Sequence, residues 1–294
     1  MELIQLGTPD GTLLAAKKYA PPVQMPVRAV VLMPSAMGVP QSYYAPFALF
    51  LAENGVAVLT FDYRGMGESV TAQFRSSLRG FEATVSDWAE QDYNAALLET
   101  SAWQPGVPLV VIGHSLGGQL LGLLPDKQLI DGIITIASGS GYWRENAPQL
   151  KRIVWLMWFF VEPLATRLCG YFPGRKLRMV GDLPKGVIQQ WSRWCRSPHY
   201  FVDESGRPMQ TGHGKITSPL LAMSFTDDEL MSRRNIDSMH AFYSNAEIER
   251  RHIHPQDIGA KRIGHFGFFR EHFRDSLWQQ ALHWLVAVPA KKAG

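Results

Sequence analysis

Short runs of apolar residues alternate with longer stretches of helical periodicity over the first half of the chain. Four runs have the composition of buried strands: residues 28–33, 56–61, 107–112 and 132–137. Three stretches between them carry apolar side chains at mostly helical spacing: residues 43–54, 82–100 and 116–124. This alternation predicts an α/β fold with a mainly parallel, doubly wound sheet and helices on both of its faces. Residues 2–6 and 12–19 predict an antiparallel hairpin at the sheet edge.

The alternation stops near residue 138 and resumes about 80 residues later. Four further elements complete it: a strand at 219–225, a helix at 232–243, a strand at 246–253 and a helix at 273–288. Residues 1–138 and 215–294 are therefore predicted to form one core domain, into which residues 139–214 are inserted.

The composition is that of a globular protein. Of the 294 residues, 46% are hydrophobic and 19% are charged, which excludes a disordered or collagen-like chain. A net charge of +3 without a long basic, aromatic stripe argues against a nucleic-acid partner. No secretory signal is recognisable, and the longest apolar run, residues 153–161, falls far short of the roughly 20 residues of a membrane-spanning helix. Two distant cysteines predict no disulfide framework and favour a cytoplasmic location.

A possible nucleophile lies directly after the third buried run. The sequence Gly113-His114-Ser115-Leu116-Gly117 is a G-x-S-x-G pattern between a predicted strand and a predicted helix. Glycines on both sides let the backbone turn sharply while the serine hydroxyl is held above the sheet edge. Ser115 is therefore the predicted nucleophile. The alternative is a glycine-rich loop in which the serine only caps the helix.

A serine nucleophile needs a histidine to accept its proton and a carboxylate to orient that histidine. Asp227 and Asp228 follow the strand at 219–225, and Asp228 is the predicted acid because a residue later in the turn reaches back over the sheet edge. Asp227 remains the alternative, and either aspartate could instead cap the next helix. His265 is the predicted base because, of nine histidines, it occupies a glycine-flanked loop between the last strand and the last helix.

Two further predictions concern the oxyanion and metals. The negatively charged oxygen of a tetrahedral intermediate needs two backbone N–H donors, one from Leu116 and one from the loop after the first buried run, where Ala36 and Met37 are the candidates. His252 and His254 alternate on a predicted strand, but no third ligand is spaced to join them, so no metal site is expected.

These residues together resemble the α/β-hydrolase superfamily, most closely its serine aminopeptidase-like and monoacylglycerol-lipase-like branch. The resemblance covers the chain outside the insertion and includes Asp62 to Ser69, which is similar to the family's D-x-R-G-x-G-x-S turn. The resemblance implies an α/β-hydrolase fold and a structural role for the turn at Arg64. One departure is Pro34-Ser35, where most relatives carry His-Gly at the oxyanion loop.

The family places a cap where this insertion lies, and the composition fits such a use. Residues 140–201 hold 12 of the 33 aromatic residues, and residues 140–196 hold ten Lys and Arg against three Asp and Glu, a net charge of +7. We expect this cap to form the acyl-side wall of a pocket for an apolar substrate, with or without an anionic head, or to touch a membrane surface transiently. The candidate substrate contacts are Trp143, Trp155 and Trp158, of which Trp155 and Trp158 are expected to be buried. The alternative is that the tryptophans only seat the cap on the core.

The sequence thus predicts a cofactor-independent serine hydrolase whose small-molecule substrate is an ester with a medium or large apolar acyl group, cleaved through an acyl-enzyme. One alternative is a peptidase or amidase acting on short peptides, which the basic cap disfavours. Another is a non-catalytic ligand-binding protein, which would not require all three triad residues.

Overall fold

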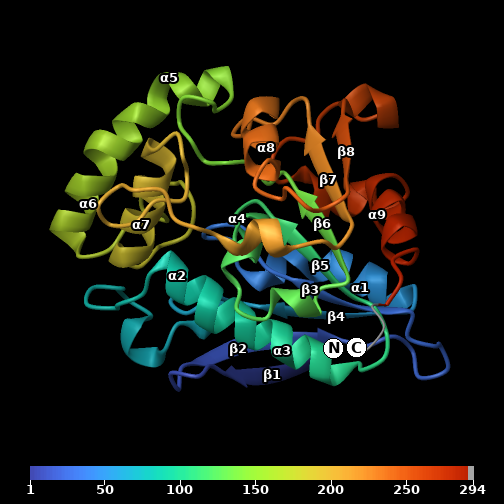
Figure 1. Ribbon diagram of the computed structural model, residues 1–294. Helices are drawn as coiled ribbons and strands as arrows, with labels where there is room; N and C mark the ends of the chain where they lie inside the picture. Colours follow the sequence, from blue (N-terminus) through green and yellow to red (C-terminus); the bar gives the residue numbers. More distant parts are fainter. Residues whose placement is uncertain (291–294) are drawn as a thin grey trace.

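The computed structural model, which describes residues 1–290, is built around one eight-stranded sheet (Figure 1). The strands are β1 (Glu2–Gly7), β2 (Leu13–Tyr19), β3 (Ala29–Met33), β4 (Val56–Phe61), β5 (Leu109–His114), β6 (Gly132–Ile136), β7 (Leu220–Phe225) and β8 (Ile248–Ile253). Their order is β1-β2-β4-β3-β5-β6-β7-β8. Strand β2 is antiparallel to both β1 and β4, and all other pairs are parallel. The predicted mainly parallel sheet with a hairpin at its edge is confirmed.

Helices cover both faces of this sheet. They are α1 (Ala45–Glu53), α2 (Val85–Asp87), α3 (Asn94–Trp103), α4 (Leu116–Gln119), α5 (Pro148–Leu156), α6 (Glu162–Cys169), α7 (Lys185–Arg196), α8 (Arg233–His240) and α9 (Leu277–Leu285). On one face Phe47 of α1 and Trp278 of α9 belong to one apolar cluster, and on the other Leu97 of α3 and Met239 of α8 belong to a second. The central strands are buried on both faces, which explains their continuous apolar runs. No helix within the described residues has both the length and the apolar character to cross a membrane.

Two predicted helices differ from the observed ones. The stretch predicted at 82–100 is observed as α2, a π-helical segment at Trp88–Tyr93 and α3, which together reach Trp103. The stretch predicted at 116–124 is observed as the single turn of α4, followed by a 3-10 turn at Leu121–Leu123. Three glycines between residues 117 and 122 weaken a regular helix there.

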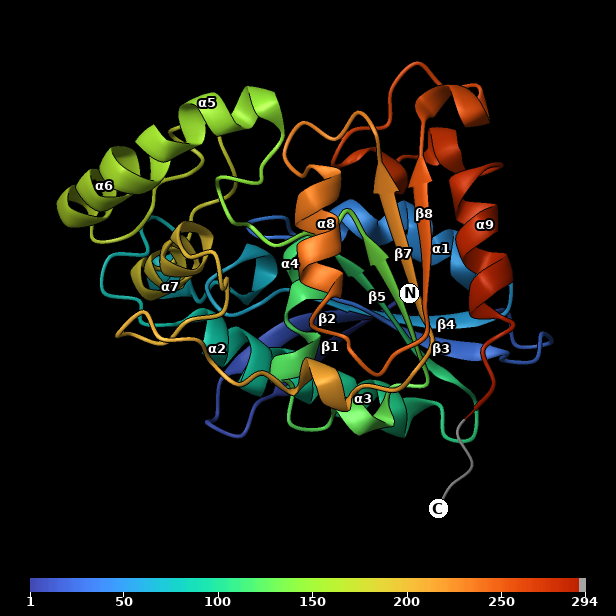
Figure 2. The same ribbon diagram turned by 45° about the horizontal axis from the view of Figure 1, so that its top comes forward.

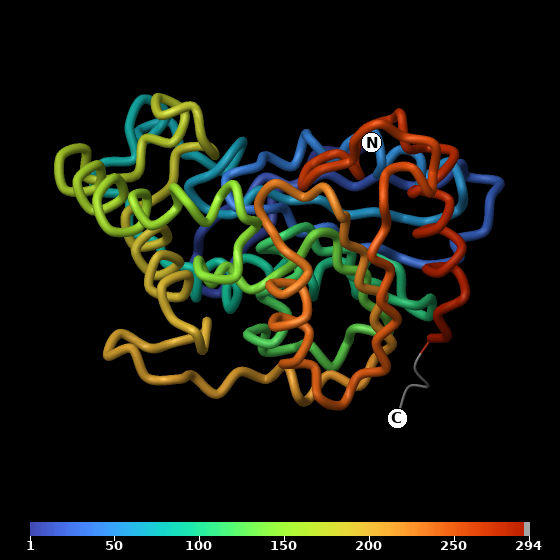
Figure 3. The backbone as a smooth tube through the Cα atoms, turned by 90° about the horizontal axis from the view of Figure 1, so that it is seen from above, coloured from blue at the N-terminus to red at the C-terminus, as the bar shows by residue number. Residues whose placement is uncertain are grey.

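The interval between β6 and β7 contributes α5, α6 and α7, which lie together on one side of the molecule, away from α9 (Figure 2). Helices α5 and α6 are joined by a π-helical segment, Met157–Val161. After α7 the chain runs back along the core towards β7 (Figure 3). On this return His213 is fully buried, and its Nε2 lies 2.9 Å from the carbonyl oxygen of Gln119 in the core. We use the word cap as a name for residues 139–214; that they form a cap domain stays a prediction.

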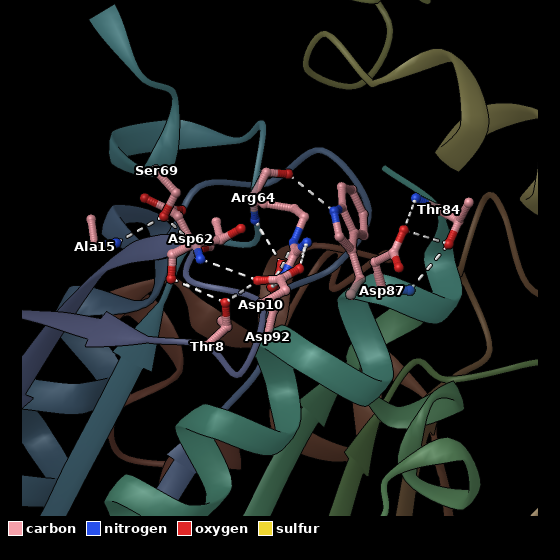
Figure 4. A network of polar contacts seen from close by, with 11 residues as sticks. Thr8, Asp10, Ala15, Asp62, Arg64, Ser69, Thr84, Asp87 and Asp92 are labelled. Atoms are coloured by element: carbon pink, nitrogen blue, oxygen red, sulfur yellow. Dashed lines mark hydrogen bonds and ion pairs between the residues drawn. The ribbon is translucent and has the colours of Figure 1, made fainter. Parts of the chain in front are cut away.

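A buried polar network fixes the turn that follows β4 (Figure 4). The Arg64 guanidinium donates to Asp92, which is fully buried, at 2.7 Å and also to Asp10 in the β1–β2 turn. In the same turn Asp62 accepts hydrogen bonds from the backbone N–H groups of Gln41 and Glu68 at 2.7 and 2.9 Å. Because Gln41 lies just beyond the loop after β3, this network holds that loop against the sheet.

Candidate active site

Ser115 lies in a strained turn between β5 and α4. Its φ is 48° and its ψ is −111°, a conformation that few residues other than glycine adopt. Such strain costs about 1–3 kcal/mol and persists only where the surroundings impose it. Here the Ser115 N–H donates to the carbonyl of Ile136, and the Ser115 carbonyl accepts from the Ser138 hydroxyl at 2.7 Å. The serine side chain makes no capping hydrogen bond to α4, so the capping alternative is wrong.

The flanking glycines are required by close packing. A Cβ atom at Gly113 would lie 2.6 Å from the Cα of Gly118, and one at Gly117 would lie 2.4 Å from the carbonyl oxygen of Pro34. Real Cβ contacts are essentially never this short, and the contacting atoms are backbone atoms that cannot move aside. The G-x-S-x-G spacing is therefore a steric requirement of this turn.

Asp228 and His265 are brought together as a buried pair. Asp228 Oδ2 lies 2.8 Å from His265 Nδ1, and both side chains are 2% exposed. The other carboxylate oxygen of Asp228 accepts from the N–H groups of Leu230 and Met231 at 2.8 and 2.9 Å. Because a carboxylate only accepts, it holds the proton of neutral His265 on Nδ1 and leaves Nε2 as a proton acceptor.

The residues on either side of Asp228 bind the backbone of the histidine loop. Asp227 accepts hydrogen bonds from the N–H groups of Ile263 and Gly264 at 2.8 and 3.1 Å, and Glu229 accepts from the N–H of His265 at 3.1 Å. Three consecutive acidic residues thus position this loop. Neither aspartate caps α8, whose N-cap is Ser232. Glu229 was not singled out from the sequence, although its place beside the two aspartates was a usable signal.

His114 links the nucleophile turn to the histidine loop. Its Nε2 lies 3.0 Å from the carbonyl oxygen of His265, an acceptor only, so Nε2 carries the proton and donates. Burial holds the pKa of His114 well below its usual range, so the ring is neutral and Nδ1 accepts. The Tyr44 hydroxyl lies 2.9 Å from this Nδ1 and donates to it, while its oxygen accepts from the N–H of Ala36 at 2.8 Å. No local pattern in the sequence pointed to Tyr44.

The structure does not join Ser115 to His265 directly. Within residues 1–290, neither the hydroxyl of Ser115 nor Nε2 of His265 has a hydrogen-bond partner. Their two loops are nevertheless adjacent, because the ring centroid of His114 lies 5.3 Å from that of His265. The Ser115 hydroxyl and His265 Nε2, between which a proton would be transferred, are therefore both free of other hydrogen bonds among the described residues.

The structure also bears on the backbone N–H groups that were expected to bind the oxyanion. Leu116, the first residue of α4, and Met37, in the loop after β3, donate to no acceptor among the described residues. Ala36 differs, because its N–H is bound to Tyr44. One donor was expected from this loop, with Ala36 and Met37 as candidates, and of the two only the N–H of Met37 has no acceptor among the described residues.

The loop after β3 packs directly against the cap. Gly38 has a φ of +72°, and the Gly181 N–H of the cap donates to its carbonyl at 3.2 Å. A cavity of about 470 Å³ adjoins this contact. Its walls come from the loop after β3, the Arg64 turn, the segment 74–78 and the cap, and include Gly38, Met66, Phe74, Leu78 and Asp182. None of Ser115, Asp228 and His265 lines it.

The cap tryptophans occupy different environments. Trp158 is 4% exposed and packs edge-to-face on Trp191, as expected. Trp155 is 44% exposed, so the prediction that it is buried is wrong. A three-residue step on a helix separates two side chains by about 60°, which lets one face inward while the other lies at the boundary. Trp143 is half-buried, with its ring centroid 6.3 Å from that of Phe159.

Comparison with known proteins agrees with this architecture. A sequence profile of the alpha/beta hydrolase family matches residues 30–274. A soluble variant of monoglyceride lipase from Saccharomyces cerevisiae, solved with a substrate analog, is 14% identical, with coverage of 97% of this chain and 96% of that chain and a TM-score of 0.62. A thermostable carboxyl esterase from Bacillus coagulans, in complex with glycerol, is 12% identical, with 98% of each chain covered and a TM-score of 0.63. An esterase from Thermogutta terrifontis is 16% identical, with 98% and 99% covered and a TM-score of 0.60. No curated protein sequence matches the chain.

Proposed function

Because the chain belongs to the α/β-hydrolase family, we propose that it is a serine hydrolase that cleaves a carboxylic ester, with Ser115, His265 and Asp228 as its catalytic triad. The observation that carries the proposal is the buried hydrogen bond between Asp228 and His265, which leaves Nε2 free on a loop adjacent to the strained Ser115. This is the arrangement that a general base needs before substrate binds, since catalytic hydrogen bonds often tighten only in the complex.

The proposed reaction has two halves. Ser115 Oγ attacks the ester carbonyl while His265 Nε2 takes its proton, and the N–H groups of Leu116 and Met37 stabilise the oxyanion. Collapse of this intermediate expels the alcohol, which receives the proton from His265, and leaves an acyl group on Ser115. Water then attacks the acyl-enzyme and gives its proton to His265. Collapse of the second intermediate breaks the bond to Ser115 Oγ, which takes the proton back from His265 as the carboxylic acid leaves. Asp228 stabilises the imidazolium formed in each half.

We place the apolar part of the substrate in the cavity between the loop after β3 and the cap. Met66, Phe74 and Leu78 supply its apolar walls, and Gly38 connects it to the proposed oxyanion donor Met37. The structural likeness to a lipase and to esterases supports an ester substrate as well.

A series of p-nitrophenyl esters of increasing acyl length tests this assignment. Leu78→Trp, which fills the cavity, is expected to lower kcat/KM for decanoate at least tenfold while changing acetate turnover by less than threefold. Leu98→Trp adds the same bulk at an exposed site on α3 and serves as the matched control. Equal losses for both esters in Leu78→Trp would contradict the location of the acyl group.

The outer face of the cap supports the further proposal of contact with a membrane surface. Five apolar side chains on the continuous helical run of α5 and α6 form an exposed stripe: Ile153, Leu156, Phe160, Leu164 and Leu168. An amphipathic helix of this kind lies in the membrane interface with its apolar face inserted. Leu164→Glu/Leu168→Glu is expected to abolish sedimentation with phosphatidylcholine vesicles without changing acetate ester turnover; unchanged sedimentation would contradict the contact.

Peptidase activity is less well supported. An aminopeptidase needs a carboxylate free to bind the substrate amine, whereas the two carboxylates at the cavity, Glu68 and Asp182, are paired with Lys17 and Arg175 at 2.6 and 2.7 Å.

A further inference from the structure

A second cavity lies within the cap, between α6 and α7, two helices that lie side by side in Figure 2. It has a volume of about 590 Å³ and is lined by four cationic side chains: Arg167, Lys185, Arg193 and Arg196. Lys185, Gln189, Arg193 and Arg196 follow one another at steps of four, four and three residues, so that they share one face of α7. We call this cavity the cap groove.

The positive charge of the cap groove exceeds the negative charge of its lining among the described residues. None of its four cations forms an ion pair with a carboxylate within 4.0 Å there, whereas Arg64, Arg234 and Arg251 elsewhere in the chain all do. The lining contains a single carboxylate, Glu162, which is 3% exposed. Its carboxylate accepts a long hydrogen bond, 3.4 Å, from the Thr166 hydroxyl and is attracted by the charge of Arg196. The lining thus carries three positive charges in excess.

One donor in the groove is both buried and unused. Nε of Arg193 is inaccessible to solvent and has no hydrogen-bond acceptor among the described residues. Leaving a buried donor unsatisfied costs about 1–3 kcal/mol, and more when the group is charged. Arg196 is already oriented, because its Nε donates to the Ser192 carbonyl at 3.3 Å and its guanidinium lies 5.6 Å from the ring centroid of Phe159. An anion in the groove would offset the mutual repulsion of the four cations that line it.

We propose that the cap groove binds a phosphate group, either of a soluble phosphate ester or of a lipid headgroup. A phosphate monoester carries between one and two negative charges at pH 7 and has several strong acceptor oxygens, which suits a cavity lined by three guanidinium groups and a lysine. The volume of the groove leaves room for the organic part of such a ligand. This site is separate from Ser115 and does not depend on the ester hydrolase assignment.

Isothermal titration calorimetry with inorganic phosphate, in a fixed chloride background, tests the site on the full chain. Wild type is expected to bind one phosphate per chain saturably. Lys185→Gln/Arg193→Gln is expected to weaken binding at least tenfold. The matched control, Lys151→Gln/Arg152→Gln, removes two charges from α5 outside the groove and is expected to bind within twofold of wild type. Arg167→Gln, on the exposed face of α6, is a second groove variant that does not rely on the folding of α7 and is expected to weaken binding at least threefold.

Absence of saturable phosphate binding by wild type, or equal weakening in groove and control variants, would overturn the proposal. Glycerol 3-phosphate and vesicles of phosphatidylcholine, with and without phosphatidic acid, then distinguish the two sources of phosphate. If phosphatidic acid strengthens vesicle binding by wild type but not by the groove variants, the ligand is a lipid headgroup. If wild type binds glycerol 3-phosphate more tightly than the groove variants do, and phosphatidic acid has no such effect, the ligand is a soluble phosphate ester. Ser115→Ala is expected to bind phosphate as wild type does, so that failure of the hydrolase assignment would leave this result unaffected.

Discussion

The backbone N–H of Ala36 donates to the hydroxyl of Tyr44 at a distance of 2.8 Å. This hydrogen bond uses the N–H of Ala36 and leaves Met37 as the proposed oxyanion donor from the loop after β3. The same hydroxyl donates to Nδ1 of His114, which in turn donates to the carbonyl of His265. A single buried tyrosine therefore connects the loop after β3 to the histidine loop.

Tyr44→Phe is expected to lower the free energy of unfolding by about 2 kcal/mol or more, because it leaves the N–H of Ala36 and Nδ1 of His114 buried without partners. The folded fraction of this variant should keep a kcat within a few fold of the wild-type value, since the N–H of Met37 is unaffected. Urea unfolding and ester kinetics measure the two quantities. Tyr63→Phe is the matched control, because Tyr63 is fully buried and its hydroxyl has no partner within residues 1–290. Equal destabilisation by both variants would contradict the role of Tyr44.

Asp228→Asn is expected to lower kcat by about 10⁴-fold with little change in KM, because an amide no longer enforces the tautomer of His265 that leaves Nε2 free. Asp227→Asn should keep kcat within about tenfold and cost about 1–2 kcal/mol of stability, since it weakens hydrogen bonds to the N–H groups of Ile263 and Gly264. Steady-state kinetics and urea unfolding of both variants separate these effects. If Asp227→Asn lowered kcat more than Asp228→Asn did, the triad acid would be Asp227 and not Asp228.

Stability is expected to fall with decreasing pH because His114, His213 and His240 are buried and their pKa values are lowered. Burial lowers the pKa of His213 and of His240 to about 4, against about 6.5 in the unfolded chain. The unfolded state therefore binds protons first, so stability is complete above about pH 6.5 and declines as the pH falls towards 4, by about 3 kcal/mol for each histidine. Urea unfolding at pH 7.5, 5.5 and 4.5 measures this decline. It should be smaller in His213→Gln but unchanged in His272→Gln, which alters an exposed side chain; identical profiles for all three proteins would refute the assignment.

Arg64→Met is expected to cost about 3–5 kcal/mol at pH 7.5, because it leaves the carboxylate of Asp92 buried without its ion-pair partner. Burial already raises the pKa of Asp92 to about 6 in the presence of Arg64. Because Arg64 lowers the pKa of Asp92, its removal raises that pKa further. The variant therefore takes up a proton on Asp92 at a higher pH than wild type does, and the loss should shrink as the pH falls from 7.5 to about 6. Thermal unfolding of Arg64→Met and of Arg64→Met/Asp92→Leu measures the effect, and the double variant should recover part of the loss.

Arg274→Met provides the comparison for that experiment. Arg274 and Glu53 form an exposed pair, for which about 1 kcal/mol or less is expected. If Arg64→Met lowered the free energy of unfolding no more than Arg274→Met does, the network of Figure 4 would not stabilise the turn after β4 as described.

The features that the sequence predicted well are local or topological. The turn at Ser115 follows from glycines that no other residue can replace, and the proximity of Asp228 and His265 follows from two loops at the carboxyl ends of neighbouring parallel strands. The buried strands were recognisable because central parallel strands are apolar on both faces.

The features that the sequence did not predict depend on contacts between distant segments. The hydrogen bond from the N–H of Ala36 to Tyr44 depends on the direction in which the Tyr44 side chain points, and the sequence alone does not show that direction. The exposure of Trp155 could not be read from spacing, because the helices of the cap carry apolar residues on their outer as well as their inner face. The cap groove likewise arises only when α6 and α7 pack together.

Labelling with a fluorophosphonate probe, followed by peptide mapping, tests the central claim most directly. One adduct per chain is expected, on Ser115, and it should be absent from Ser115→Ala and strongly reduced in His265→Gln while both variants keep the circular dichroism of wild type. An adduct on any other residue, or ester turnover by Ser115→Ala above about a hundredth of the wild-type rate, would contradict the account.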